Sequence, residues 1–219
     1  MRSFYSGEIL STLGNLSLSE TSPPQSFIEP LTLTEVRKYL RLPEISPSDP
    51  AEDDELTGFI VGAREQAEIL QRQDLVRKQY DLHFDYWPDW RISLRAPLVS
   101  VDLVQYRDSD GTIVPLTENT HYIIDTFKRP GFITPAYNAT WPSFTPWPSS
   151  ALLIRFTSGY TANSAFWADA GARLKIGMKL LISQWYEQRL PFEKGSGAVQ
   201  EYGYAITSCL SYGAVPGVF

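Results

Sequence analysis

The residues best suited to chemistry are three polar side chains in a segment of alternating pattern. Asp81, His83 and Asp85 alternate with bulky apolar residues. Alternate residues of a strand point to one face, so these three side chains could act together as metal ligands. No further ligand follows at a defined spacing, and a polar strand face is the commoner explanation. The pattern therefore favours a half-buried strand over a metal site.

Two other segments match known sites only in part. Asp108 and Asp110 begin like a calcium-binding loop, but the twelfth position, counted from Asp108, is Asn119 instead of the required glutamate. Residues 108–111 are instead typical of a hairpin turn. His121 is one of only two histidines, which leaves few ways to build a Ser-His-Asp arrangement.

Motifs of catalysis and nucleotide binding are absent from the sequence. It contains no G-x-S-x-G elbow, no P-loop and no G-x-G-x-x-G run. Gly195-Ser196-Gly197 follows an expected helix and not a strand, so it indicates a linker. The single Cys209 excludes an intrachain disulfide and a multi-cysteine metal site. We therefore expect a protein that is not an enzyme and needs no cofactor.

The aromatic segment at residues 141–148 allows three interpretations. Exposed Trp141 and Trp147 could stack on sugar rings, as in a carbohydrate-binding module. The prolines between them favour a loop that packs on its own sheet. As a third possibility, Trp141, Phe144 and Trp147, together with Trp167, contact a neighbouring subunit, since large aromatic residues dominate interface energetics.

Composition and charge limit the classes of partner. Aromatic residues make up 13% of the 219 residues, and the net charge is −6 with scattered Lys and Arg, so a surface that grips DNA is not expected. Apolar runs of about four residues are far shorter than the ~20 that cross a bilayer. Arg2 is the only early cation and Glu8 interrupts the apolar residues, so no signal peptide is expected. The sequence predicts a soluble protein made in a cytoplasm, with no membrane partner.

The first third of the chain predicts an arm followed by helices. Residues 1–30 are expected to form an N-terminal arm that ends in a stiff Ser-Pro-Pro linker. Residues 31–78 form the first helical part. Thr32 and Glu35 make a capping-box pattern before a short helix, and a long helix with one apolar stripe begins at the acidic residues 52–55.

A β-rich insertion over residues 79–160 is expected to interrupt the helices. The hydrophobic period becomes two, and turns at 108–111 and 128–131 predict about six mostly antiparallel strands. Residues 161–190 then contain a C-terminal amphipathic helix. Residues 191–219 have little helical or strand period, which indicates an extended tail. The predicted fold class is α+β, a helical core with an inserted antiparallel β-unit.

The order of these elements resembles the head-tail connector (adaptor) proteins of tailed bacteriophages, in the subgroup with a β-rich insertion. Each matching piece alone is ordinary helix, strand or turn chemistry, and their order and spacing carry the likeness. The matching pieces are Leu31-Thr32-Leu33-Thr34-Glu35-Val36 to Leu42, Asp53-Asp54-Glu55-Leu56, Trp87-Pro88, Ile92-Ser93-Leu94, Pro97-Leu98-Val99-Ser100-Val101, Tyr106-Arg107-Asp108-Ser109-Asp110-Gly111, Tyr122-Ile123-Ile124-Asp125, Trp141-Pro142, Phe156-Thr157-Ser158-Gly159-Tyr160 and Leu180-Leu181-Ile182-Ser183-Gln184-Trp185-Tyr186-Glu187-Gln188-Arg189. The proline that commonly opens the family's last helix is missing here.

The resemblance implies a structural subunit of the virion, located at the head-tail interface and assembled in the host cytoplasm. Such subunits form a homo-oligomeric ring, usually a dodecamer, beneath the portal protein. The ring extends the DNA channel and offers a platform to the downstream neck or tail-completion protein. Double-stranded DNA would pass through the lumen without sequence-specific binding, because an acidic wall repels its phosphates.

The resemblance further implies that the C-terminal segment binds the portal protein. Removing residues 208–219 is then expected to leave the domain folded and to abolish portal binding. The candidate contacts between subunits or with the neck are the four aromatic residues of the third interpretation above. The alternative function is a virion-associated carbohydrate-binding module that uses the Trp- and Pro-rich loop. The candidate portal-docking residues are Tyr202, Tyr204, Leu210, Tyr212, Val215 and Phe219.

Overall fold

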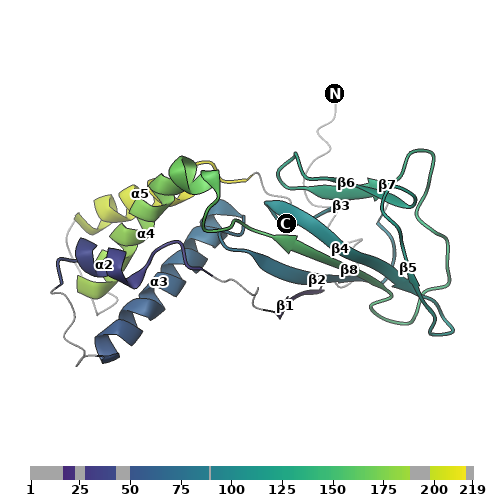
Figure 1. Ribbon diagram of the computed structural model, residues 1–219, viewed down its shortest axis with the longest axis horizontal. Helices are drawn as coiled ribbons and strands as arrows, with labels where there is room; N and C mark the ends of the chain where they lie inside the picture. Colours follow the sequence, from purple (N-terminus) through teal and green to yellow (C-terminus); the bar gives the residue numbers. More distant parts are fainter. Residues whose placement is uncertain (1–16, 23–27, 43–49, 89, 188–197, 216–219) are drawn as a thin grey trace. The chain divides into compact units, whose positions relative to one another are not determined.

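The chain folds into two units, one of helices and one of antiparallel strands (Figure 1). The structure is a computed structural model that describes residues 17–22, 28–42, 50–88, 90–187 and 198–215. The helical unit holds the described residues between Ser26 and Arg77 and between Tyr160 and Gly217. The β unit holds Lys78–Gly159 together with the strand at residues 17–22. The predicted α+β class is confirmed.

The short helix α2 (Leu33–Tyr39) is fixed by the capping box that the sequence predicts. Thr32 Oγ1 accepts a hydrogen bond from the N–H of Glu35 at 3.2 Å. Glu35 Oε2 in turn accepts one from the N–H of Thr32 at 2.9 Å. A helix of seven residues is marginal alone, so this cap and the packing of its apolar face sustain it.

The long helix α3 (Pro50–Gln71) is tied to α2 through charges at its start. Arg37 of α2 is buried, and its Nη1 lies 2.6 Å from Asp53 Oδ1 and 3.1 Å from Glu52 Oε2. The Tyr186 hydroxyl also donates to Glu52 Oε1 at 3.0 Å. A buried charge needs a partner, and Glu52 and Asp53 supply two for Arg37. Both carboxylates lie in the first turn of α3, where the helix dipole favours negative charge.

Two further helices complete the helical unit. A 3₁₀ turn, η1 (Ala165–Ala168), leads into α4 (Ala170–Glu187), which confirms the predicted C-terminal amphipathic helix. The last helix is α5 (Ala198–Ser211). The helices share one apolar core, formed by Leu31, Val36, Leu56, Ile60, Ala63, Ala67, Leu75, Leu174, Met178, Leu181, Ile182, Ile206 and Leu210.

Helix α5 corrects the expectation of an extended tail over residues 191–219. Its sequence contains Gly203, Thr207 and Ser208, which are weak helix formers and obscure the pattern. Ile206 and Leu210, four residues apart, are both buried in the helical core. Tertiary packing of this short apolar stripe therefore produces the helix that local propensity does not predict.

The larger sheet of the β unit has five strands in the order β1-β2-β8-β4-β5. Its edge strand β1 lies within the region expected to be an N-terminal arm and pairs antiparallel with β2, Ser17 opposite His83 and Leu18 opposite Leu82. Every neighbouring pair in this sheet is antiparallel. The strands are β1 (Ser17–Ser22), β2 (Lys78–Phe84), β4 (Leu98–Arg107), β5 (Ile113–Pro115) and β8 (Leu152–Ser158).

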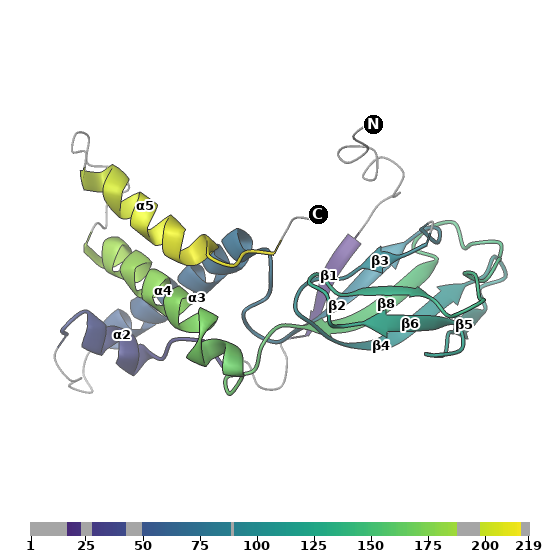
Figure 2. The same ribbon diagram turned by 90° about the horizontal axis from the view of Figure 1, so that it is seen from above.

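A smaller sheet of three strands, β3-β7-β6, covers one face of the larger sheet (Figures 1 and 2). It consists of β3 (Ile92–Ser93), β6 (Tyr122–Asp125) and β7 (Phe132–Pro135). The two sheets share an apolar core, to which Leu82, Val104 and Ile154 contribute from one sheet and Ile92, Tyr122 and Ile133 from the other. The sequence predicted about six strands but not their division into two sheets.

Both predicted turns are confirmed. Residues 108–111 join β4 to β5, and residues 128–131 lie between β6 and β7. Within the described part of the chain, no helix is long and apolar enough to cross a membrane.

Candidate docking surface

Helix α5 lies directly against α4 because one residue of α4 has no side chain (Figure 2). A Cβ atom added to Gly177 would lie 2.7 Å from Leu210 Cδ2 and 3.0 Å from Cys209 Cβ. Real Cβ atoms do not approach so closely, so the spacing of the two helices depends on glycine at this position. The neighbour that this glycine admits is α5.

The end of α5 is held to the end of α3 by a buried glutamine. Gln71 Nε2 donates to the backbone oxygen of Leu210 and, at 3.1 Å, to that of Tyr212. The backbone oxygen of Gln71 accepts from the N–H of Val215 at 3.0 Å. Gln73 Nε2 donates to Gln71 Oε1 at 3.1 Å, which satisfies the remaining acceptor. The carbonyl groups at the end of α5 thereby find partners inside the protein.

This packing corrects the set of candidate portal-docking residues. Leu210 and Val215 are buried in the helical unit, so they hold α5 in place and are not available to a partner. Tyr204 and Tyr212 are 79% and 58% exposed and remain candidates. The side chain of Tyr202 and all of Phe219 lie outside the described residues.

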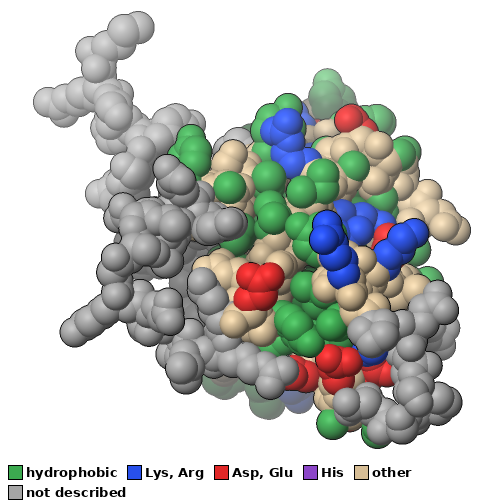
Figure 3. Space-filling view, turned by 90° about the vertical axis from the view of Figure 1, so that its left-hand side faces the viewer, with side chains coloured by type: hydrophobic (Ala, Val, Ile, Leu, Met, Phe, Trp, Pro, Cys, Tyr) green, Lys and Arg blue, Asp and Glu red, His purple; other side chains and the backbone are tan. Residues whose placement is uncertain are grey.

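Exposed residues of α4 and α5 form a mixed apolar and basic surface, which we call the α4–α5 face. It comprises Tyr204 and Tyr212 with Arg173 and Ile176 of α4. The guanidinium carbon of Arg173 lies 4.0 Å from the centre of the Tyr212 ring, and Ile176 is exposed. Figure 3 shows that hydrophobic side chains are also exposed, with Lys and Arg side chains beside them, at the end of the helical unit that faces the viewer there.

Two further cations of α4 act on the cap of α2. Burial would raise the pKa of Glu35, but the N–H of Thr32 and the charges of Lys175 and Lys179 outweigh it and lower that pKa. Glu35 is therefore ionised at neutral pH, and α4 carries a basic side toward α2.

The packing of α5 also changes the expectation for removal of residues 208–219. That segment contains Leu210 and Val215, and it supplies the backbone groups that pair with Gln71. Deleting it would open the helical core, so loss of portal binding by such a variant would not identify a docking surface. Substitutions of exposed side chains are the appropriate test.

The polar face of β2 is explained by pairing within the sheet and not by a metal. Arg155 donates to both carboxylate oxygens of Asp81 at 2.7 Å, and Asp85 Oδ1 accepts from the N–H of Ser150 at 2.7 Å. His83 is half-buried on the same strand. Among the residues that the structure describes, no three His, Cys, Asp or Glu side chains are grouped so that they could hold a metal ion.

The possible calcium loop is a closed hairpin turn. Asp110 Oδ1 accepts from the N–H of Thr112 at 2.8 Å, which lowers the pKa of Asp110. The N–H of Gly111 donates to the backbone oxygen of Asp108 at 2.9 Å. His121 Nδ1 accepts from the N–H of Thr117 at 3.0 Å, so it serves a neighbouring turn. These local hydrogen bonds explain Asp108, Asp110 and His121 as residues that stabilise turns.

The aromatic loop packs on its own unit, as one of the three interpretations predicted. The Trp141 ring stacks on Trp87 with centroids 4.5 Å apart and an angle of 3° between the planes. Phe144 lies 4.4 Å from Tyr106, and the Arg107 guanidinium carbon lies 4.0 Å from the Trp147 ring. One ring face of Trp141 is thus covered by Trp87, and Arg107 lies over the Trp147 ring, so both tryptophans help to hold the loop on its own unit.

Trp167 is held within the helical unit. Its Nε1 donates to the backbone oxygen of Thr161 at 3.1 Å, and its ring meets Phe166 edge-on at 5.1 Å. Gly171 lets it pack closely, since a Cβ there would lie 2.6 Å from Trp167 Cε3. Trp167 and the three aromatic residues of the loop thus have partners in their own units, and their role between subunits stays a prediction.

Sequence reasoning missed the most exposed aromatic residues of the β unit. Phe127 is 98% exposed in the turn between β6 and β7, and Tyr137 is 91% exposed after β7. A large apolar residue within a turn is an unusual choice, and that was the available signal.

Comparison with known proteins gives matches only among solved structures. No protein-family model matches the sequence, and no curated protein matches it. A chain in the neck of an empty gene transfer agent (GTA) particle, computed with C6 symmetry, aligns with TM-score 0.71 and 21% identity over 93% of this chain and 97% of that one. A chain in the virion of the native GTA particle aligns with TM-score 0.67 and 21% identity over 92% and 97%. A chain in the neck of the native GTA particle, computed with C12 symmetry, aligns with TM-score 0.65 and 18% identity over 93% and 97%.

These alignments include the helical and the β unit together, since they span almost the whole of each chain. They confirm the fold that the resemblance to head-tail connector proteins implied, a helical core with a β-rich insertion. The chain therefore has the fold found in the neck of a gene transfer agent particle.

Proposed function

We propose that the chain is a structural, non-catalytic subunit of the head-tail neck of a phage-like particle. The observation that carries the proposal is the alignment of the whole chain with a neck chain, over 93% of one and 97% of the other. In this role the chain contributes contacts, and its location is the virion.

Several copies form a ring beneath the portal in this proposal, and the ring extends the DNA channel. Support comes from the similar necks, which were computed with C6 and C12 symmetry. The net charge of −6 suits a channel through which DNA passes without being held. A downstream neck or tail-completion protein would bind the opposite end of the ring.

The α4–α5 face is the surface that docks on the portal. It carries two exposed tyrosines and an arginine, the residue types most often found at the energetic centres of interfaces. The Arg173–Tyr212 contact holds both side chains in place, which reduces the entropy lost on binding.

The test replaces exposed tyrosines in matched pairs. Tyr204→Ala with Tyr212→Ala is expected to keep the fold and to weaken binding to the portal protein of the same particle by about tenfold or more. Tyr86→Ala with Tyr137→Ala removes two exposed tyrosines of the β unit and should leave binding unchanged. Binding is measured by sedimentation. If both double variants bind the portal protein as tightly as the original chain, the α4–α5 face is not the docking surface.

A further inference from the structure

The turn between β6 and β7 presents a phenylalanine to solvent. Phe127 is 98% exposed, more than any other large hydrophobic side chain in the described part of the chain. Burying such a side chain on a partner removes a large apolar area from water. We call residues 126–131 the β6–β7 tip.

The tip is held in a defined shape. Asp125 Oδ1 accepts from the N–H of Phe127 at 2.9 Å and from that of Lys128 at 3.3 Å. Gly131 lies so close to β4 that a Cβ there would be 2.6 Å from Leu98 Cβ, and its backbone oxygen accepts from the N–H of Leu94 at 2.8 Å. A turn fixed in this way loses little entropy when its exposed side chain is bound.

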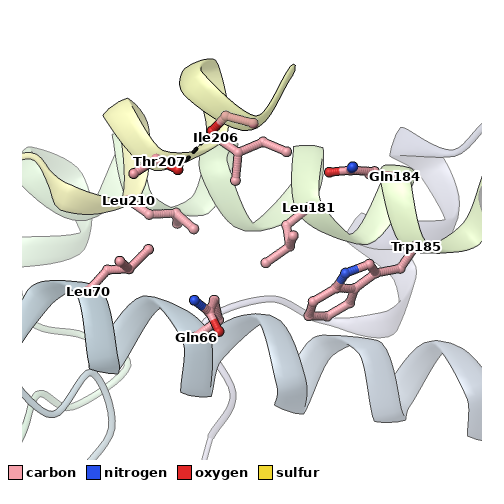
Figure 4. Close-up of a pocket in the computed structure, with 9 residues that line it drawn as sticks. Gln66, Leu70, Leu181, Gln184, Trp185, Ile206, Thr207 and Leu210 are labelled. Carbon is pink, nitrogen blue, oxygen red and sulfur yellow. Dashed lines mark hydrogen bonds between the residues drawn. The ribbon is translucent and has the colours of Figure 1, made fainter. Parts of the chain in front are cut away.

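The helical unit contains a pocket of about 310 Å³ between α3, α4 and α5. Figure 4 shows its apolar side chains directed toward one another, with Trp185 on one side and Leu210 on the other. Pockets of roughly 300 Å³ and more accept small ligands, so one aromatic ring fits. The pocket is lined by Gln66, Leu70, Leu181, Gln184, Trp185, Gly203, Ile206, Thr207 and Leu210.

The aromatic wall of the pocket is fixed from behind. The Trp185 ring lies 6.0 Å from the ring of Phe59, and a Cβ added to Gly62 would approach it to 3.3 Å. Trp185 therefore offers a fixed surface against which a phenylalanine ring can pack in a tilted or offset arrangement.

The charges next to the two features are opposite in sign. Lys128 follows Phe127 in the tip and is exposed, with its Nζ 5.1 Å from the Phe132 ring. The pocket residue Gln66 is preceded on α3 by the exposed Glu65, which shares the buried Arg64 with Glu29 and Glu68, so this cluster stays net negative. Helix α4 ends at the exposed Glu187. Such complementarity favours binding of the tip to the pocket over binding of two like surfaces.

We propose that Phe127 of one subunit inserts into the α3–α4–α5 pocket of a neighbouring copy of the chain. A ring with rotational symmetry requires a contact between two different surfaces of the same protein, and the tip and the pocket are such a pair. This inference rests on the proposed function, because only a ring supplies a neighbour to every subunit. It identifies a contact within that ring.

The first test removes the aromatic ring at the tip. Phe127→Ala is expected to raise the dissociation constant between subunits by about 30-fold or more, as loss of an interface anchor does. Tyr137→Ala is the matched control, since Tyr137 is also almost fully exposed in the β unit. Rings counted by electron microscopy should be lost with the first variant at concentrations at which the control and the original chain form them.

The second test closes the pocket without altering the core. A Cβ at Gly203 meets no atom within 4 Å, so the side chain of Gly203→Leu begins in open space beside the pocket that Gly203 lines. Gly58 of α3 is equally open but does not line the pocket, so Gly58→Leu is its control. Loss of rings is expected only with Gly203→Leu.

The third test detects the contact directly. One chain carries Lys128→Cys and a second carries Thr207→Cys, both with Cys209→Ser, and the two are mixed and oxidised. A disulfide-linked pair is expected, whereas Ile113→Cys in place of Lys128→Cys should give none. If rings form but Phe127→Ala assembles normally and no linked pair appears, the inference is wrong and the proposed function stands. If the original chain forms no ring even with its portal protein, both are wrong.

Discussion

At the scale of single residues, the contact between α4 and α5 depends on the absence of a side chain at Gly177. The neighbour at this position is α5, within the segment that the sequence predicted to be an extended tail. An added methyl group meets Leu210 and Cys209, and Leu210 cannot move freely because it is buried.

Gly177→Ala is therefore expected to lower the free energy of unfolding by about 1–3 kcal/mol, the usual cost of an overpacked core. Gly58→Ala is the control in α3, where the added Cβ meets open space, and it should raise stability by about 0.5–1 kcal/mol. Urea unfolding measures both. Equal effects of the two substitutions would show that the α4–α5 spacing does not depend on glycine.

The lowered pKa of Glu35 makes a second prediction at this scale. A carboxyl group whose pKa is lower in the folded state than its ordinary value of 4.5 stabilises the fold at pH values above 4.5. This contribution is lost as the pH falls through the folded-state pKa. The difference in stability between the original chain and Glu35→Gln should be present at about pH 7 and shrink as the pH falls below 4.5 and through the lowered folded-state pKa. A difference that grows toward acid pH would contradict the assignment.

At the scale of elements, Gln71 links the end of α5 to α3. Gln71→Ala removes the donors to Leu210 and Tyr212 and the acceptor of Gln73, so we expect a loss of about 1–3 kcal/mol. Hydrogen exchange should rise chiefly in residues 207–215. Gln66→Ala, also in α3 but facing the pocket, serves as the control. Unchanged exchange in α5 with Gln71→Ala would show that another contact holds the helix.

The helices and turns with strong local signals could be predicted from the sequence. The Thr32–Glu35 cap, the apolar stripe of α3, the helix at Ala170–Glu187 and the turns at 108–111 and 128–131 are local patterns, and the structure confirms each. Capping and periodicity act within a few residues, so they can be read without knowledge of the fold.

Elements that depend on distant partners were missed or misplaced. β1 forms only because β2 offers an open edge, and α5 forms because its apolar stripe meets α3 and α4. The three-stranded sheet pairs β3 with β7, although β4, β5 and β6 lie between them in the chain. Such long-range pairings leave little trace in local sequence, which explains why two sheets were read as one β-unit.

At the scale of the whole molecule, the order of elements identified the fold while the contact surfaces stayed hidden. The resemblance to connector proteins rested on that order, and the solved GTA neck chains confirm the fold at about 20% identity. Leu210 and Val215 were expected at a docking surface because they are apolar and near the terminus, yet they lie in the core. Exposure is decided by packing, which sequence composition does not reveal.

The most direct measurement of the central claim is electron microscopy of the purified chain mixed with the portal protein of its particle. We expect rotationally symmetric rings of the chain bound at one end of the portal, with six- or twelve-fold symmetry as in the similar necks. A chain that stays monomeric and unbound at concentrations well above those of assembly would contradict its role as a neck subunit.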